Sequence, residues 1–186
     1  MAQIGLKDLH IAILTKDTRE ELIYETPEPV VDVINASVNP TINTTEVYAD
    51  DRLSELLPIL GKIEVEVETA DIPLAIRAKI LGHEIKEGVL VEKGTNVPPY
   101  LALGFKSLKS NGKYRYVWLL KGMAQSIIED YTTKKDSVEA KTPKTKFIFM
   151  ARVHDDELKH TADEDSVDFT GAATWFDSVP GVITIP

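Results

Sequence analysis

The stretch G-K-I-E-V-E-V-E-T-A-D-I-P, residues 61–73, decides the fold class of this chain. From Ile63 to Glu68 it alternates β-branched apolar residues with glutamates. Successive side chains of a strand point to opposite faces, so this alternation predicts a strand with one face on a core and one face in water. The water-facing side would present a row of three carboxylates, from Glu64, Glu66 and Glu68. Such a row repels itself, which indicates that the surroundings of this face favour negative charge.

A short helix is predicted directly after this strand, over residues 71–82. Asp71 can accept hydrogen bonds from the free N–H groups of a helix start, and Pro73 suits the first turn. Gly82 can adopt the left-handed conformation that ends a helix. The side expected against a sheet holds Ile72, Ala75, Ile76 and Ile80, and the side expected in water holds Arg77 and Lys79.

Most of the other periodic windows also predict strands, which indicates a mainly β fold, an antiparallel β-sandwich with one flanking α-helix. Residues 9–14 and 30–38 are also predicted to be strands, and Pro27, Pro29 and Pro40 around the second are typical of an edge strand or a loop entry. Residues 138–153 contain the almost unbroken apolar run K-F-I-F-M-A-R-V, which is typical of a central strand.

Residues 41–60 form the longest polar excursion of the chain. They begin T-I-N-T-T-E-V-Y-A-D-D, a composition that predicts a long inter-strand loop or a β-arm. The second half of the segment also has apolar residues at helical spacing, although Pro58 limits a helix there to about one turn or two. The residues at that spacing are Leu53, Leu56, Leu57 and Leu60.

The sharpest turn signal is S-N-G-K, residues 110–113. Asn-Gly suits the two positive-φ positions of a type I′ turn, so we predict a hairpin with a two-residue turn. In that register Phe105 lies opposite Trp118, and the two share one face of the sheet. The same register pairs Leu103 with Leu120 and Ser107 with Tyr116.

Composition indicates one domain over residues 1–186, since a chain with 43 % hydrophobic residues can bury one sizeable core. The net charge of −9 weighs against a nucleic-acid or anionic-membrane binder, because phosphate binding needs clustered Lys and Arg. The absence of cysteine excludes disulfides, thiol nucleophiles and Cys-based metal sites. We find neither a secretory signal at the start nor an apolar run of the ~20 residues that a membrane span requires, so we expect no membrane association.

Two acidic segments are the strongest candidates for a metal site. The first, H-D-D-E-L-K-H over residues 154–160, does not have the spacing of H-E-x-x-H, and an exposed acidic loop is the simpler interpretation. The second, A-D-E-D-S-V-D-F-T-G over residues 162–171, has Asp168 where an EF-hand loop needs glycine. No nucleotide-binding or nucleophile motif occurs. We therefore predict no enzyme activity, no cofactor and no metal.

Tyr114, Tyr116 and Trp118 are the aromatic residues best placed to stack on a ligand. They have no basic groove beside them in the sequence, so we interpret them as core or interface residues. Two alternatives stay open. One is a monomeric β-sandwich that binds carbohydrate or protein on these aromatics, and the other is a hydrolase built on residues 154–160.

Several stretches, in their order along the chain, resemble the major tail proteins of long-tailed bacteriophages, specifically the phi13-like family of tail tube subunits. They cover nearly the whole chain, and none is a catalytic signature. They are I-G-L-K-D-L-H-I-A-I-L-T, S-V-N-P-T-I-N-T-T-E-V-Y-A-D-D, G-K-I-E-V-E-V-E-T-A-D-I-P, L-G-H-E-I, P-P-Y-L-A-L-G-F-K-S-L-K-S-N-G-K-Y-R-Y-V-W-L-L-K-G and W-F-D-S-V.

The resemblance implies a phage tail tube fold whose copies form hexameric rings that stack into a hollow tube for DNA ejection. It implies as partners further copies of this chain, a tape measure protein, a distal tail protein and a tail terminator. DNA would pass through without specific binding. The protein would belong to the virion tail of a phage, a prophage or a tailocin after assembly in the host cytoplasm. Residues 154–186 would form a C-terminal extension, with no further immunoglobulin-like domain.

Two sets of residues receive roles from this resemblance. Glu64, Glu66 and Glu68 are expected to line the lumen, where a negative wall repels phosphates within about 8–10 Å and lets DNA slide. Residues 41–60 are expected to reach the adjacent ring. The ring-stacking residues expected within that segment are Tyr48, Asp50 and Asp51.

Overall fold

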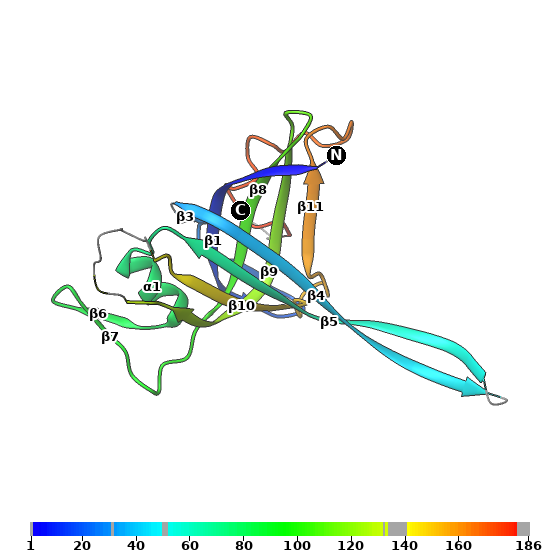
Figure 1. The fold of residues 1–186 in the computed structure, drawn as a ribbon, viewed down its shortest axis with the longest axis horizontal. Helices are drawn as coiled ribbons and strands as arrows, with labels where there is room; N and C mark the ends of the chain where they lie inside the picture. Colours follow the sequence, from blue (N-terminus) through cyan, green and yellow to red (C-terminus); the bar gives the residue numbers. More distant parts are fainter. Residues whose placement is uncertain (1, 31, 50–51, 132, 134–140, 182–186) are drawn as a thin grey trace.

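The computed structural model of this chain describes residues 2–30, 32–49, 52–131, 133 and 141–181 (Figure 1). It is mainly β, with one helix among the described residues, α1 (Leu74–Leu81). No helix in those ranges is long and apolar enough to cross a membrane. The strands are β1 (Gln3–Asp17), β2 (Leu22–Tyr24), β3 (Glu28–Val30), β4 (Val33–Ala49), β5 (Arg52–Thr69), β6 (Glu84–Lys86), β7 (Val89–Val91), β8 (Tyr100–Lys109), β9 (Tyr114–Ile128), β10 (Lys144–Met150) and β11 (Lys159–Asp163).

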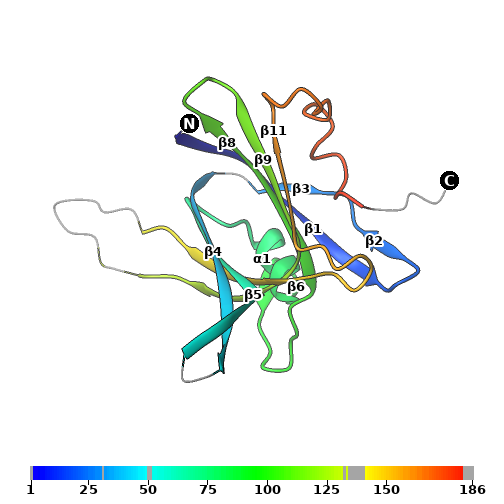
Figure 2. The same ribbon diagram turned by 90° about the vertical axis from the view of Figure 1, so that its right-hand side faces the viewer.

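Nine of these strands form one antiparallel sheet in the order β2-β1-β8-β9-β10-β5-β4, with β3 paired to β1 and β11 paired to β9. Because β8 occupies one edge of β9, β11 and β10 lie end to end along the other edge, against residues 115–119 and 121–128 (Figure 2). The β1–β8 part and the β5–β10 part pack over one core. The result is the β-sandwich-like, mainly antiparallel fold that the sequence predicted.

One face of β5 packs into this main core, as the alternation in the opening stretch predicted. Ile63, Val65 and Val67 are 4 %, 2 % and 3 % exposed. They pack in one cluster with Phe147 and Phe149 of β10 and with residues of β1, β8 and β9. β10 has β9 on one side and β5 on the other, so its predicted central position is confirmed.

Helix α1 packs on the main core, but its start differs from the prediction. Pro73 occupies the cap position and makes no side-chain hydrogen bond, and Asp71 is exposed and is not the cap. Gly82 ends the helix with φ 68°, as predicted. Ala75 is exposed because it lies away from the buried side. The buried residues of α1 are Ala78, Ile80 and Leu81.

The polar side of α1 is partly exposed, and it also holds the helix to the sheet through ion pairs that the sequence did not signal. Arg77 Nη1 donates to Glu129 Oε1 at 2.6 Å, just beyond the end of β9. Lys79 Nζ donates to Glu28 Oε1 of β3, also at 2.6 Å. These bonds raise the pKa of both basic groups, and Glu129 shows the matching lowered pKa.

The hairpin of β8 and β9 forms in a register one residue away from the predicted one. The N–H of Lys109 donates to the carbonyl of Lys113 at 2.8 Å, so three residues connect the strands, and Gly112 takes the positive φ of 78°. A shift of one residue moves side chains to the other face of a sheet. Phe105 therefore lies in the main core while Trp118 faces away from it. The observed pairs are Phe105 with Val117, Leu103 with Leu119 and Ser107 with Arg115.

A second, smaller core lies on the opposite face of β8 and β9 and is covered by the C-terminal segment. Trp118 is 0 % exposed, and its Nε1 donates to the carbonyl oxygen of Trp175 at 3.0 Å. Gly104, paired with Trp118, leaves room for the indole, since a Cβ there would lie 2.7 Å from the ring. Tyr116 is also buried, so the core interpretation is confirmed for these two aromatics. The other members are Ala12, Ala102, Leu120 and Val179, with Tyr24 and Phe176 against them.

β4 and β5 continue beyond the body as a two-stranded arm, which we define as residues 42–49 and 52–60 and which projects to the right in Figure 1. Pairing runs out to Ala49 and Arg52, so the β-arm interpretation is correct and the loop alternative is wrong. The leucines at helical spacing lie in β5 and not in a helix. Their spacing arises because the strand carries apolar residues on both faces.

Candidate assembly surfaces

Direct cross-strand pairs divide the side chains of the arm between its two faces. β5 supplies apolar residues to both faces, and β4 supplies mostly polar ones. One face carries Ile42 with Leu60, Thr44 with Pro58 and Glu46 with Leu56. The other face carries Asn43 with Ile59 and Thr45 with Leu57.

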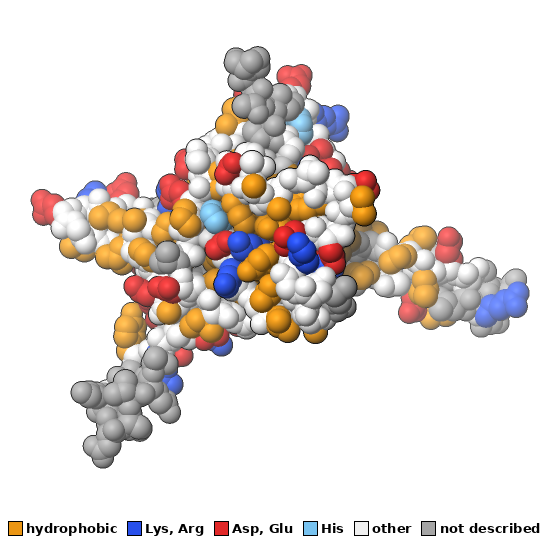
Figure 3. All heavy atoms as spheres, turned by 90° about the horizontal axis from the view of Figure 1, so that it is seen from above, with side chains coloured by type: hydrophobic (Ala, Val, Ile, Leu, Met, Phe, Trp, Pro, Cys, Tyr) orange, Lys and Arg blue, Asp and Glu red, His pale blue; other side chains and the backbone are white. Residues whose placement is uncertain are grey.

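The apolar side chains of the arm are exposed to solvent in the monomer. Ile42, Leu56 and Leu60 are 60 %, 52 % and 52 % exposed on one face, and Leu57 and Ile59 are 44 % and 61 % exposed on the other. Figure 3 shows hydrophobic side chains along the projecting arm. A contiguous apolar surface of this kind marks an interaction site, and a two-stranded hairpin alone is marginally stable in water. The arm is therefore a candidate interaction surface.

Tyr48, one of the expected ring-stacking residues, lies near the tip of the arm and is 65 % exposed. Its hydroxyl donates to Glu46 Oε2 at 2.7 Å, and this bond to a carboxylate raises the pKa of Tyr48. Asp50 and Asp51 lie outside the described residues. The structure thus places one member of this predicted set on an exposed surface.

Glu64, Glu66 and Glu68 point outward from β5, on the face opposite the core. The side chains that flank this row differ between the two neighbouring strands. On the β4 side it faces Asn39, Ser37 and Asn35, and on the β10 side it faces Ile148, Lys146 and Lys144, each in that order.

Each glutamate of the row contacts a lysine or a hydroxyl group, and these contacts offset the repulsion between like charges on one strand face. Lys62 Nζ lies 2.7 Å from Glu64 Oε1, and Lys146 Nζ lies 3.7 Å from Glu66 Oε2. Glu68 accepts a hydrogen bond from a threonine hydroxyl before β10. The hydrogen bond from Lys62 lowers the pKa of Glu64. The face is therefore a mixed polar surface whose negative charge is partly compensated.

The first acidic segment near the C-terminus is organised around a buried arginine. Arg152 is 1 % exposed, and its Nη2 donates to Asp155 Oδ2 at 2.5 Å and to Glu157 Oε2 at 3.0 Å. His160 Nε2 lies 2.6 Å from the same glutamate, whereas His154 Nδ1 contacts a backbone carbonyl of the β1–β2 turn. The two histidines thus have separate partners and do not converge on one site.

The second acidic segment is held by basic residues of the β8–β9 hairpin. Arg115 Nε and Nη2 donate to the two carboxylate oxygens of Asp163 at 2.6 and 2.7 Å, and these bonds lower the pKa of Asp163 to about 2. The buried Lys109 contacts Asp165. Across the described ranges, no group of three or more His, Asp or Glu side chains is placed to hold a metal ion.

A groove at the root of the arm was not identified from the sequence. Its walls come from segments that are far apart in the chain, and no local pattern signals their approach. We define the root groove by its lining residues, Val38, Pro40, Leu60 and Ile63 from β4 and β5, and Glu157, Leu158, Lys159 and His160 from the start of β11 and the turn before it.

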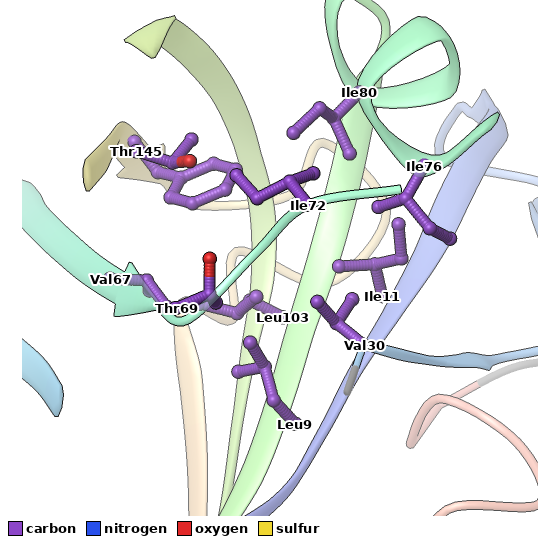
Figure 4. A pocket seen from close by; sticks show the side chains of 11 residues that line it. Leu9, Ile11, Val30, Val67, Thr69, Ile72, Ile76, Ile80, Leu103 and Thr145 are labelled. Carbon is purple, nitrogen blue, oxygen red and sulfur yellow. The ribbon is translucent and has the colours of Figure 1, made fainter. Parts of the chain in front are cut away.

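A second, small pocket lies between α1 and the sheet (Figure 4). Side chains such as Ile72, Ile76 and Phe147 line it. Thr69 is 2 % exposed and points into this space, and its Oγ1 has no hydrogen-bond partner among the described residues (Figure 4). Ligand sites need several convergent polar groups, which this almost wholly apolar lining does not supply. The pocket therefore belongs to the packing of helix on sheet.

Known proteins resemble this chain in structure but not in sequence. The chain matches no protein-family model and no curated protein. Among solved structures, it is similar to a chain of the anti-feeding prophage cap, which terminates the tube, with 8 % identity, a TM-score of 0.46 and coverage of 88 % of this chain and 94 % of that one. It is also similar to a chain of the six-fold symmetrised baseplate of the anti-feeding prophage, with 8 % identity, a TM-score of 0.49 and coverage of 87 % and 96 %. Both TM-scores lie below 0.5, a level of likeness from which no function follows.

Proposed function

We propose that this chain is a structural tail protein whose copies assemble into stacked hexameric rings and form the tube of a phage-type tail. The observation that carries the proposal is the arm, whose apolar side chains are exposed on both faces. Assembly buries such a surface, whereas a monomeric binding module would leave it in water. The resemblance of the sequence to tail tube subunits supports the same role, with the arm and Tyr48, Asp50 and Asp51 reaching the adjacent ring.

Open strand edges support assembly of neighbouring copies within a ring. Among the described residues, β4 pairs only with β5 and β11 pairs only with β9, so each strand has one unpaired edge. An unpaired edge is a template for pairing with another strand. β4 is 17 residues long, and its edge would be a liability in a permanent monomer. In a ring, such an edge is covered by the next copy.

The row of Glu64, Glu66 and Glu68 faces the lumen in this proposal. Its support is the outward-facing position of the row, in which Glu64 is exposed and Glu66 and Glu68 are half-buried, and its carboxylates, which repel phosphates near the wall. Two lysines of this face, Lys62 and Lys146, are paired with Glu64 and Glu66, which reduces their availability to phosphates. Replacement of all three glutamates with lysine should make isolated tubes retain DNA in a salt-dependent manner. Unchanged DNA binding by the variant tubes would contradict the lumen assignment.

The further partners follow from the resemblance. A tape measure protein would lie inside the tube, a distal tail protein at its tip and a tail terminator at the head end. DNA would pass through without specific binding. The protein would act in the virion tail, with assembly in the host cytoplasm and residues 1–186 as one domain.

Negative-stain electron microscopy of the purified protein, over a range of protein and salt concentrations, tests the proposal. We expect hexameric rings or tubes, and more of them at raised salt, because screening weakens repulsion between subunits of net charge −9. Monomers that persist under all conditions, and that also fail to add to preformed tail initiators, would contradict it. That outcome would favour the monomeric binding module.

A further inference from the structure

The root groove combines an apolar floor with one lysine, Lys159. The carboxylate in the groove, Glu157, is already engaged by Arg152 and His160. Lys159 makes no ion pair or hydrogen bond through its side chain within the described residues. The apolar floor consists of Val38, Pro40, Leu60, Ile63 and Leu158.

The surroundings of Lys159 favour the arrival of a carboxylate. Partial burial of the ammonium group, together with repulsion from Arg115, lowers the pKa of Lys159. Arg115 is itself neutralised by Asp163. A negative charge brought close to Lys159 would therefore stabilise its charged form without competing with an existing pair.

The arm carries a carboxylate that matches this requirement. Glu55 is exposed and makes no ion pair or hydrogen bond through its side chain within the described residues, whereas Glu46 already accepts the hydroxyl of Tyr48. Residues two apart on a strand share a face, so Glu55 lies on the same face as Leu57 and Ile59. This face presents two exposed apolar side chains followed by one free negative charge.

We infer that the root groove receives the arm of a second copy of this chain, with Leu57 and Ile59 on the apolar floor and Glu55 beside Lys159. The inference rests on the proposed function and names the surface on which the arm docks. The arm and the groove are different surfaces, so the contact is heterologous and repeats from copy to copy. Repetition of such a contact produces a ring or an open stack, whereas an isologous dimer would stop at two copies.

A second copy matches the groove in charge and in apolar character. Within the described residues, the groove offers a cation and the arm offers an anion whose side chains make no ion pair, and each lies beside aliphatic side chains. The groove adjoins the root of its own arm through Leu60 and Ile63, so a docked arm would lie along the face that carries Ile42 and Leu60. The contact thus covers one face of the docked arm and part of the opposite face of the receiving arm.

Disulfide trapping tests this contact directly, because the chain has no cysteine of its own. Glu55→Cys and Lys159→Cys variants would be mixed under mild oxidation, and single cysteines exclude an intramolecular bond. We expect a disulfide-linked heterodimer to form at least about tenfold faster than in a mixture of Val89→Cys with Lys159→Cys, because docking raises the effective concentration. Val89 is 62 % exposed on β7, at the end of the molecule away from the arm (Figure 1). Equal rates in the two mixtures would overturn the inference.

Charge reversal separates this inference from the proposed function. Glu55→Lys and Lys159→Glu should each weaken association by up to about fivefold, and the two changes in one chain should restore it. Tubes that form normally without trapping of positions 55 and 159 would overturn the docking contact and leave the tube proposal intact. Trapped heterodimers in a protein that never forms rings or tubes would support the contact and contradict the tube.

Discussion

Replacement of Leu57 and Ile59 with threonine should weaken assembly and leave the folded monomer unchanged. Threonine is β-branched and retains strand propensity, so the arm keeps its pairing. The two side chains are 44 % and 61 % exposed in the monomer, and this exposed surface is what a partner would cover. Complete burial of a Leu or Ile side chain contributes about 1.5–3 kcal/mol. Scaled to the exposed fractions, the two residues contribute about 2 kcal/mol to each contact.

A loss of about 2 kcal/mol lowers the association constant about 30-fold. The critical concentration for assembly, measured by sedimentation at fixed salt, should rise by a factor of that order. Val89→Thr is the matched control, since Val89 is β-branched, lies in a strand and is 62 % exposed, but belongs to β7 and not to the arm. Thermal unfolding of the monomers should agree within about 0.5 kcal/mol, as is usual for exposed substitutions.

The reasoning would be refuted by an unchanged critical concentration in the arm variant with a normally folded monomer. The exposed apolar faces would then not be assembly surfaces. It would also be refuted if Val89→Thr raised the critical concentration as much as the arm variant. In that case any loss of exposed apolar surface would suffice, and the arm would have no special role.

Three further predictions concern the stability of the folded chain. Gly104→Ala should destabilise the folded chain by about 1–3 kcal/mol in thermal unfolding, because the added Cβ would lie 2.7 Å from a buried indole. Gly94→Ala is the control and should be nearly neutral, because a Cβ there would have no atom within 4 Å. Arg152→Met should lower the free energy of unfolding in urea by about 1.5–3 kcal/mol, because it removes charge-assisted hydrogen bonds to two partly exposed carboxylates. Lys146→Met, which breaks an exposed pair, should cost under about 1 kcal/mol in the same assay. The pKa of Asp163 is about 2 in the folded protein against an ordinary value of 3.8, so its pairing stabilises the fold above about pH 4 and this stabilisation is lost as the pH falls toward 2. Asp163→Asn should therefore be less stable than the unaltered protein at pH 7, and the two stabilities should converge near pH 2.

The inner face of β5 could be predicted from the sequence because it depends only on the strand lying between a core and water. A strand between a core and water gives an alternating pattern, and Ile63, Val65 and Val67 are buried as that pattern requires. The sequence also predicted that the three glutamates lie on the outer face of β5, but it did not predict which side chains surround them. Their cross-strand neighbours depend on the register with β10, which brings Lys146 beside Glu66 and which no local signal specifies.

The sequence of the β8–β9 turn is compatible with two registers, one with a two-residue and one with a three-residue connection. Asn-Gly suits a two-residue turn, but Gly112 with φ 78° serves equally well at the end of a three-residue connection. What decides the register is the packing on both faces, since it places Phe105 in the main core and Trp118 against Gly104 in the second. That second core is completed by the C-terminal segment, which lies far away in the sequence.

Part of the arm has apolar residues at helical spacing although it forms a strand, and the cause of this spacing bears on its function. Period-two patterning arises only where one face of a strand is buried and the other is wet. In residues 56–60 both faces carry apolar side chains, so the alternation disappears and helical spacing arises by coincidence. A solvated two-stranded arm has no need of two apolar faces. The loss of alternation is therefore what the proposed assembly, with a partner on each face of the arm, would require.

Charge and the arm together give assembly a controlled onset. Subunits of net charge −9 repel one another at low salt, which keeps an exposed apolar arm from associating at random. Attraction between arm and groove acts only at contact, whereas repulsion between whole subunits extends over about a Debye length, roughly 8–10 Å. Added salt weakens the long-range repulsion and leaves the apolar contact largely intact. Assembly should thus rise with salt up to the point at which the Glu55–Lys159 pair is screened, and a steady decline from the lowest salt upward would contradict this balance.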